Sequence, residues 1–124
     1  MSHFTTIKVE IKNGTILHEV LRELGYQVEL NTTVRGYQGK TTQADYVIRQ
    51  TNGYDLGFRQ MGETYEIVAD FWGAKVNQAE LLNSIHQKYA HKTLMTFVNQ
   101  QGFDVESEDV LEDGTVRVVV GKWV

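Results

Sequence analysis

Apolar and polar positions alternate along much of the chain, which is the pattern of strands in a half-buried sheet. Alternating runs occupy residues 3–11, 26–30, 45–51, 54–60 and 64–70. In the run 54–60, the alternation predicts that Asp55, Gly57 and Arg59 lie on the face opposite the apolar residues. Asn52-Gly53 precedes this run, and Asn-Gly is typical of a β-hairpin turn. The pattern therefore predicts an antiparallel meander.

Two other segments repeat apolar positions every three or four residues, which is the spacing of an amphipathic helix. The first begins at Asn13, a favoured N-cap residue, and ends at Gly25. The second begins at Asn77 and runs to about Gln101. A last hairpin, 103–111 and 115–122, follows it. The sequence thus predicts a single α+β domain, 1–124, with a mostly antiparallel sheet of about six or seven strands and two helices packed on one face.

The segment Asn31–Gln43 interrupts the alternation and is predicted to be an irregular connection. A connection of this length within a compact domain is more often functional than an ordinary turn. Its two glycines are expected to act as hinges that let Arg35, Tyr37 and Lys40 project into solvent. With Trp72, which follows a later strand, these three residues are the predicted partner- or ligand-binding site.

Composition and charge limit the classes of function. The 124 residues contain no cysteine, which excludes a disulfide framework, a thiol nucleophile and a cysteine-ligated metal. The formal net charge of -4 argues against bulk binding of nucleic acid, which depends on neutralising phosphates. No run approaches the roughly 18 apolar residues of a membrane span, so membrane insertion is not expected.

Candidate catalytic and metal-ligating residues do not form a recognisable set. His86 and His91 are five residues apart on the predicted second helix and therefore diverge, unlike an i, i+4 metal pair. Asp45 and Asp70 lie near strand ends, where we expect their carboxylates to bond to backbone N–H groups in the adjoining turns. The sequence predicts no catalytic residues, no cofactor and no metal, and hence no enzyme.

Several short stretches, taken in order along almost the whole chain, resemble the hypothetical chloroplast reading frame thirty-five (ycf) family of cyanobacteria and plastids. These stretches are LGY (24–26), VRGYQG (34–39), YDLGF (54–58), YEIVAD (65–70), QKYAHKTL (87–94) and QGF (101–103). The resemblance implies a protein of photosynthetic organisms, located in the plastid stroma or the cyanobacterial cytoplasm. It implies no established catalytic residues.

The charges are unevenly spread, and this favours a binding function. Residues 31–62 contain four basic and two acidic side chains, whereas residues 103–114 contain six acidic and no basic ones. Such polarity helps to orient a partner. We therefore predict a non-enzymatic accessory protein that binds a protein partner, in assembly or maintenance of the photosynthetic apparatus.

The alternative is a small-ligand or nucleotide-binding regulator, in which the segment Asn31–Gln43 supplies donors to an anion. Self-association through an open sheet edge, near the Val-rich last strand, also stays open.

Overall fold

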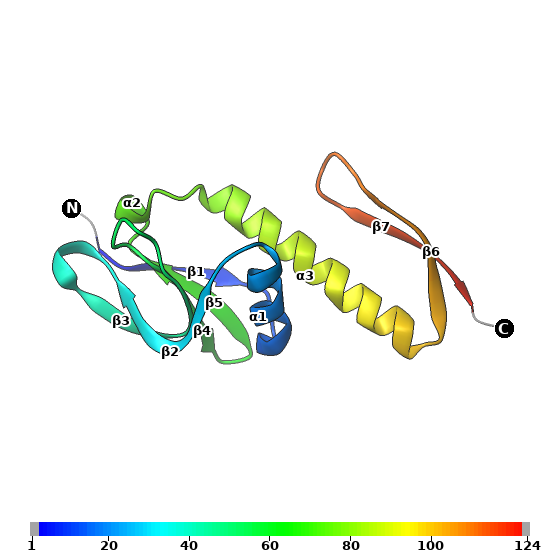
Figure 1. Ribbon diagram of the computed structural model, residues 1–124, viewed down its shortest axis with the longest axis horizontal. Coiled ribbons are helices and arrows are strands. Elements are labelled where there is room, and N and C mark those ends of the chain that lie inside the picture. The colour runs from blue at the N-terminus through cyan, green and yellow to red at the C-terminus, as the bar shows by residue number, and fades with distance from the viewer. Residues whose placement is uncertain (1–2, 123–124) are drawn as a thin grey trace. The chain divides into compact units, whose positions relative to one another are not determined.

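The computed structural model describes residues 3–122, apart from the side chains of residues 103–107, 116, 118, 120 and 122. The chain divides into two compact units, Met1–Gln78 (unit 1) and Ala79–Val124 (unit 2). Unit 1 contains a five-stranded sheet, and unit 2 contains a two-stranded ribbon (Figure 1). The organisation of residues 1–124 as a single domain stays a prediction.

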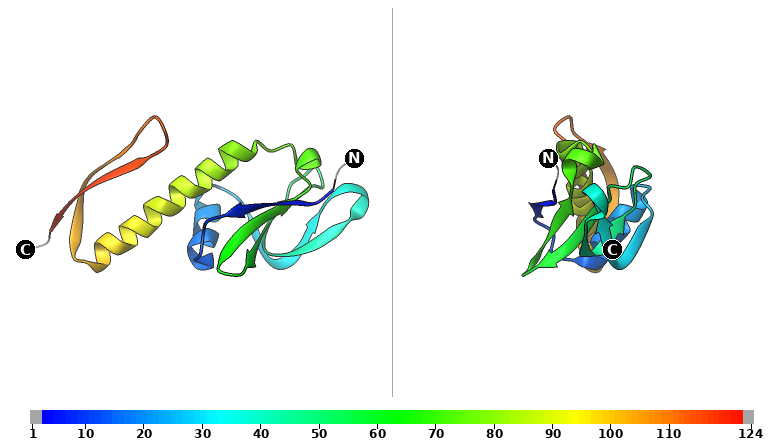
Figure 2. Two further views of the ribbon diagram at one scale, coloured as in Figure 1. Left: turned by 180° about the vertical axis from the view of Figure 1, so that it is seen from behind. Right: turned by 90° about the vertical axis from the view of Figure 1, so that its left-hand side faces the viewer.

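The sheet of unit 1 is antiparallel throughout. Its strands are β1 (Thr5–Val9), β2 (Val28–Arg35), β3 (Thr41–Ile48), β4 (Leu56–Met61) and β5 (Thr64–Ala69). They lie in the order β1-β5-β4-β3-β2, and the view from behind in Figure 2 shows β1 beside β5. The predicted α+β class with an antiparallel sheet is confirmed.

Helix α1 (Gly14–Glu23) forms where the apolar spacing predicts it. Asn13 caps it, because its Oδ1 accepts the N–H of Ile16 at 3.1 Å, and Gly25 follows its last turn with a φ of 96°. The ring of His18 stacks on Tyr46 of β3 at 5.2 Å, which places α1 over one face of the sheet. The buried side chains of the helix are Leu17, Val20 and Leu21.

Gly14, the first residue of α1, lies directly against the sheet. A Cβ at this position would overlap with Oη of Tyr65 and would lie 2.9 Å from its Cζ. Gly14→Ala should therefore destabilise unit 1 by about 1–3 kcal/mol, although alanine is the better helix former. Urea unfolding measures this loss, and Tyr65→Phe in the same background should restore part of it. An alanine variant as stable as the wild type would contradict the close packing.

The prediction of an irregular connection over Asn31–Gln43 is wrong. Strands β2 and β3 continue through it as a hairpin, with pairs from Leu30 opposite Tyr46 to Arg35 opposite Thr41. The reason is the run of β-branched side chains on both strands, which favours extended backbone. These residues are Thr32, Thr33, Val34, Thr41 and Thr42.

The hairpin tip is a tight turn closed by backbone bonds. The N–H of Gly36 donates to Lys40 O at 2.9 Å, and the short 3-10 turn η1 (Tyr37–Gly39) lies between them. Gly36 is buried against the ring of Phe4, which leaves no space for a Cβ. Its backbone is ordinary extended chain, with a φ of -144°. Gly36 is therefore a close-packing residue and not a hinge.

The β2–β3 hairpin encloses a second apolar cluster on the sheet face opposite α1. Asn31, with a φ of 48°, interrupts the ladder near the middle of the hairpin. Beyond it, the hairpin contributes two of the four buried members of the cluster, against which Phe4 packs. The four are Val34, Ala44, Val47 and Val68. Gly57 of β4 lies among them, so its predicted place on the face opposite Leu56 and Phe58 is confirmed, and that face is apolar at this position.

Unit 2 confirms the second helix and the last hairpin. It contains α3 (Gln78–Gln100, with its first residue in unit 1), β6 (Phe103–Val110) and β7 (Val116–Lys122). Strands β6 and β7 form a separate antiparallel ribbon. Within unit 2, His91 Nε2 of α3 lies 3.1 Å from Glu108 Oε2 of β6. The valine side chains at 116, 118 and 120 lie outside the described residues, and self-association through a sheet edge stays a prediction.

Candidate functional site

Asp70 joins the hairpin tip to the short helix α2 (Phe71–Ala74). Its carboxylate is buried, with 1% exposure. Oδ1 accepts the N–H of Gly73 at 3.4 Å and so caps α2, while Oδ2 accepts the N–H of Tyr37 at 3.3 Å. The tip and α2 accordingly lie at the same end of unit 1 (Figures 1 and 2). The expectation that Asp70 bonds to backbone donors is confirmed, whereas Asp45 accepts the N–H of Gln60 at 2.8 Å, which belongs to β4 and not to an adjoining turn.

The turn between β3 and β4 fixes α2 from a second side. Gln50 Nε2 donates to Ala74 O at 3.1 Å and to Tyr54 O at 2.7 Å. Asn52 Nδ2 donates to Gly73 O at 3.2 Å. Gly73 lies so close to the ring of Tyr54 that a Cβ would overlap with it. The short helix thus depends on side-chain bonds and close packing for its position.

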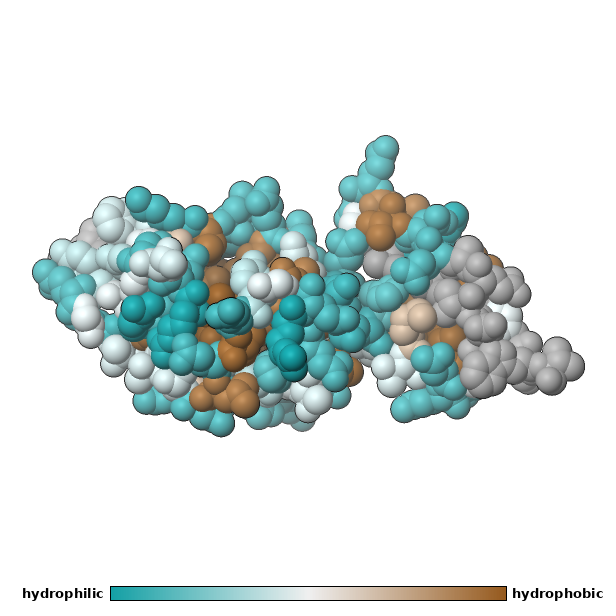
Figure 3. Space-filling model, viewed as in Figure 1, coloured by the Kyte–Doolittle hydropathy of each residue, from teal (hydrophilic) through white to brown (hydrophobic). Residues whose placement is uncertain are grey.

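Trp72 projects from this fixed helix into solvent. Its side chain is 71% exposed, the largest value among the exposed large hydrophobic residues that the structure describes. The surface over the β2–β3 hairpin is hydrophilic or near neutral in Figure 3. Tryptophan is among the side chains most enriched at protein interfaces.

A buried carboxylate, Asp55, organises the other side of the hairpin. It is fully buried, and its two oxygens accept bonds from Arg35 Nε at 2.8 Å and Arg35 Nη2 at 2.9 Å. Arg49 Nη1 donates to it at 2.7 Å. The backbone N–H groups of Arg35 and Gln50 complete the set at 2.9 and 3.1 Å. Asp55 was predicted as a strand residue of the run 54–60, but it precedes β4 and its side chain is buried.

This environment keeps Asp55 ionised. Burial alone would raise its pKa, but the bonds from the Arg35 side chain, from the backbone N–H groups of Arg35 and Gln50, and from Arg49 outweigh it. The pKa of Asp55 falls to about 2, from an ordinary value of 3.8. The same contact with Asp55 raises the pKa of Arg35.

The four residues predicted as a binding site separate into two places. The tip and α2 bring Tyr37, Lys40 and Trp72 to one end of unit 1, and we call this the tip surface. Lys40 is exposed, and Tyr37 is half-buried. The guanidinium of Arg35 turns instead to Asp55 and to Gln50 O, 3.0 Å away.

The sequence did not predict that Asp55, Arg49, Gln50 and Asn52 come together in the structure. Their partners are mostly distant along the chain; Asp55 and Arg35, for example, are 20 positions apart. The one local signal was the Asn-Gly turn, which placed Asn52 beside a tight bend. Nothing near Asp55 in the sequence indicates that it is buried.

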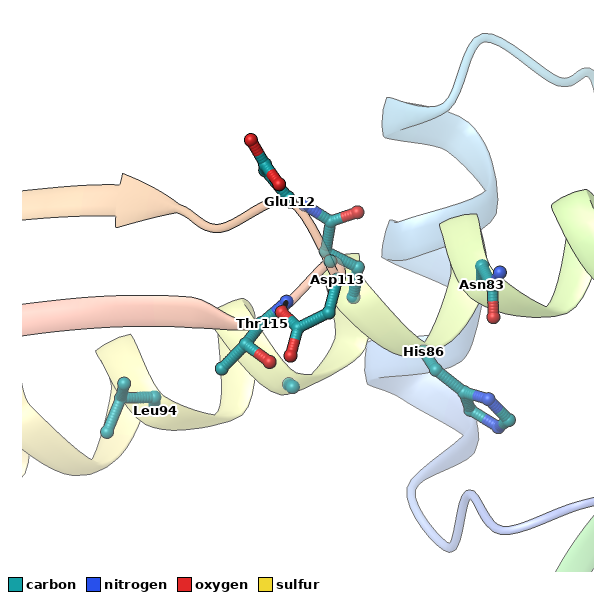
Figure 4. Close-up of a pocket in the computed structure, with 9 residues that line it drawn as sticks. Asn83, His86, Leu94, Glu112, Asp113 and Thr115 are labelled. Carbon is teal, nitrogen blue, oxygen red and sulfur yellow. Dashed lines mark hydrogen bonds between the residues drawn. The ribbon is translucent and has the colours of Figure 1, made fainter.

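Unit 2 has a hollow of its own, between α3 and the turn from β6 to β7 (Figure 4). Its volume is about 540 Å³. Its labelled lining residues are Asn83, His86, Leu94, Glu112, Asp113 and Thr115. Glu112 points away from the helix, and His86 points away from the turn. The titratable groups do not converge, so this hollow is not a candidate catalytic centre.

Two absences hold for the part of the chain that the structure describes. Among those residues, no three His, Asp or Glu side chains gather in a group that could hold a metal ion. No helix within them is long and apolar enough to cross a membrane.

Comparison with known proteins assigns the family. The family model described as a protein of unknown function, DUF1257, matches residues 20–119. The chain belongs to the DUF1257 family. Among DUF1257 relatives, the uncharacterized protein ycf35 of Guillardia theta is 34% identical over 126 residues, which cover 99% of this chain and 98% of that protein. The ycf35 proteins of Pyropia yezoensis and Cyanophora paradoxa are 28% and 27% identical over the same shares. No solved structure matches this DUF1257 chain. The resemblance to the chloroplast reading frame family is confirmed.

Proposed function

We propose that this DUF1257 protein is a non-enzymatic accessory protein that binds a protein partner through the tip surface. The observation that carries the proposal is Trp72, 71% exposed on a helix that Asp70, Gln50 and Asn52 hold in place. A tryptophan in a fixed position loses little conformational freedom on binding and is among the commonest energetic anchors of protein interfaces.

The chemistry around Trp72 indicates what kind of partner fits. Lys40 is an exposed cation at the end of the same turn that contains Tyr37. A partner with an apolar pocket for the indole and an acidic side chain at its rim would complement both groups. The two buried carboxylates of unit 1, Asp55 and Asp70, are occupied by backbone and arginine donors, which supports a structural and not a catalytic role for them.

The similarity to uncharacterized ycf35 proteins of Guillardia theta, Cyanophora paradoxa and Pyropia yezoensis supports a role in photosynthetic organisms. The process that we propose is assembly or maintenance of the photosynthetic apparatus, in the plastid stroma or the cyanobacterial cytoplasm. Binding without catalysis is sufficient for such a role, since an assembly factor holds a subunit in place and then releases it.

Quantitative capture from photosynthetic cells tests the proposal. Tagged wild type, Trp72→Ala and Met61→Ala are compared, because Met61 is also an exposed hydrophobic residue of unit 1, at 56%. We expect Trp72→Ala to weaken binding of the recovered partner by at least roughly thirtyfold, or about 2 kcal/mol, and Met61→Ala to leave it unchanged. Equal recovery of the same proteins by all three would remove the tip surface as the contact.

A further inference from the structure

The Arg35–Asp55–Arg49 cluster borders a hollow that the proposed function does not use. Its volume is about 580 Å³, and it lies wholly within unit 1. The residues that line it come from the segment before β2, from β2 and from the chain just after β3. They are Gln27, Thr33, Arg35, Arg49, Gln50 and Thr51. All six are polar, two are basic and none is acidic.

Both arginines are held in position before any ligand arrives. Arg35 makes a two-pronged contact with Asp55, at 2.8 and 2.9 Å, and also donates to Gln50 O at 3.0 Å. Arg49 donates to Asp55 and to Thr33 O, each at 2.7 Å. The side chains are nevertheless 45% and 28% exposed. A ligand that reaches them does not have to order two long side chains, which is a large part of the cost of binding to arginine.

The two arginines give the surface of the hollow more positive charge than nearby acids neutralise. Asp55 lies fully buried and is shared by the two arginines. The second acid, Glu29, bonds to Arg49 Nε at 2.7 Å but is 54% exposed. An exposed ion pair contributes little free energy, so an anion can displace Glu29 at small cost. Displacement would leave two guanidiniums against one buried carboxylate, a local excess of positive charge.

From these contacts we propose that the hollow binds a tetrahedral oxyanion, inorganic phosphate or the phosphate group of a phosphomonoester. Two guanidiniums, the hydroxyls of Thr33 and Thr51, and the side-chain amide of Gln27 offer more donors than the two oxygens of a carboxylate can use. A phosphate has enough oxygens to accept from both arginines and from the hydroxyls. The site is separate from the tip surface, and binding there does not require a protein partner.

Titration of the whole chain with inorganic phosphate, followed by NMR, tests this inference. We expect saturable shifts at the amides of Arg35, Gln50 and Thr51 within about 10 mM phosphate, a range that covers millimolar dissociation constants. Sodium chloride at matched ionic strength should not reproduce the shifts. Non-saturating shifts, or shifts spread evenly over the chain, would overturn the proposal.

Three variants leave the Asp55 contacts intact and test which residues bind phosphate. Glu29→Gln removes the competing carboxylate and should tighten phosphate binding several-fold. Thr51→Val removes one hydroxyl from the lining and should weaken it several-fold. Lys40→Gln removes a positive charge from the tip surface and should have no effect on phosphate. Equal affinity in Glu29→Gln and wild type would contradict the site, and loss of phosphate binding in Lys40→Gln would move it to the tip surface. Capture of a protein partner by Trp72 is measured separately, so either proposal can fail alone.

Discussion

Replacement of Asp55 by asparagine is expected to lower the free energy of unfolding by about 3–5 kcal/mol, because it removes one partner of a buried ion cluster. The asparagine leaves Arg35 and Arg49 without the charge that both contact, at 2.8 and 2.7 Å. It also places an amide NH₂ where the carboxylate accepts five bonds from side chains and backbone. Some of the backbone and arginine donors around it must then lose their acceptor.

Urea unfolding at neutral pH measures this loss, and Asp45→Asn is the matched control. Asp45 is only half-buried, and its carboxylate accepts the backbone N–H of Gln60. An asparagine Oδ1 can still accept that bond, so we expect Asp45→Asn to cost about 1 kcal/mol or less. Comparable losses in the two variants would show that Asp55 does not organise unit 1.

The carboxylate of Asp55 also makes the free energy of unfolding depend on pH in the acid range. The pKa of Asp55 is lowered on folding, from an ordinary value of 3.8 to about 2. Its contribution is therefore fully present above pH 3.8 and is lost as the pH falls towards and through about 2. The stability difference between wild type and Asp55→Asn should be constant near neutral pH and should narrow across this acid window. A difference that stays constant down to pH 2 would contradict the lowered pKa.

For Gly57→Val, two physical effects predict opposite changes in the free energy of unfolding. Valine is a much better strand residue than glycine, so an exposed position would gain stability on substitution. In the structure, a Cβ at Gly57 would overlap with Val34 Cγ2 and lie 2.9 Å from Ala44 Cβ and 3.0 Å from Val68 Cγ1. We expect a loss of about 1–3 kcal/mol or more, since three packed side chains must move apart.

Thermal or urea unfolding of Gly57→Val shows directly whether the substitution stabilises or destabilises the protein. Val34→Ala in the same background opens space at the nearest contact and should recover part of the loss, even though Val34→Ala alone is destabilising. A Gly57→Val variant that is more stable than wild type would show that β2 and β3 do not close over β4 as described.

Local sequence signals were sufficient for much of the fold. Asn13 and Gly25 mark the ends of α1, and the three-to-four-residue apolar spacing predicts both long helices, because these signals act within a few residues. The alternating runs likewise predict the strands of the meander. The predicted start of the strand after the Asn-Gly turn was less accurate, since Tyr54 and Asp55 precede β4 and are not part of it.

The candidate site could not be predicted in the same way, because it is built from contacts between residues that are distant in the sequence. The bend near Asn31 turns the hairpin over the sheet, so Gly36 reaches Phe4 and the N–H of Tyr37 reaches Asp70, 33 residues away. Arg35 was correctly selected as a charged residue of interest, but its orientation depends on Asp55. Glycine spacing alone suggested a flexible loop, whereas the β-branched residues between the glycines and Asn31 build a strand.

We expect Trp72 to become buried when the protein binds its partner, and hydroxyl-radical footprinting of the unmodified chain measures this burial. Oxidation of Trp72 is compared between the free protein and the isolated complex, with Met61 as the internal control. Both side chains are exposed in the free protein, at 71% and 56%. We expect several-fold protection of Trp72 in the complex with no change at Met61. Equal oxidation of Trp72 in the free and bound states would contradict it.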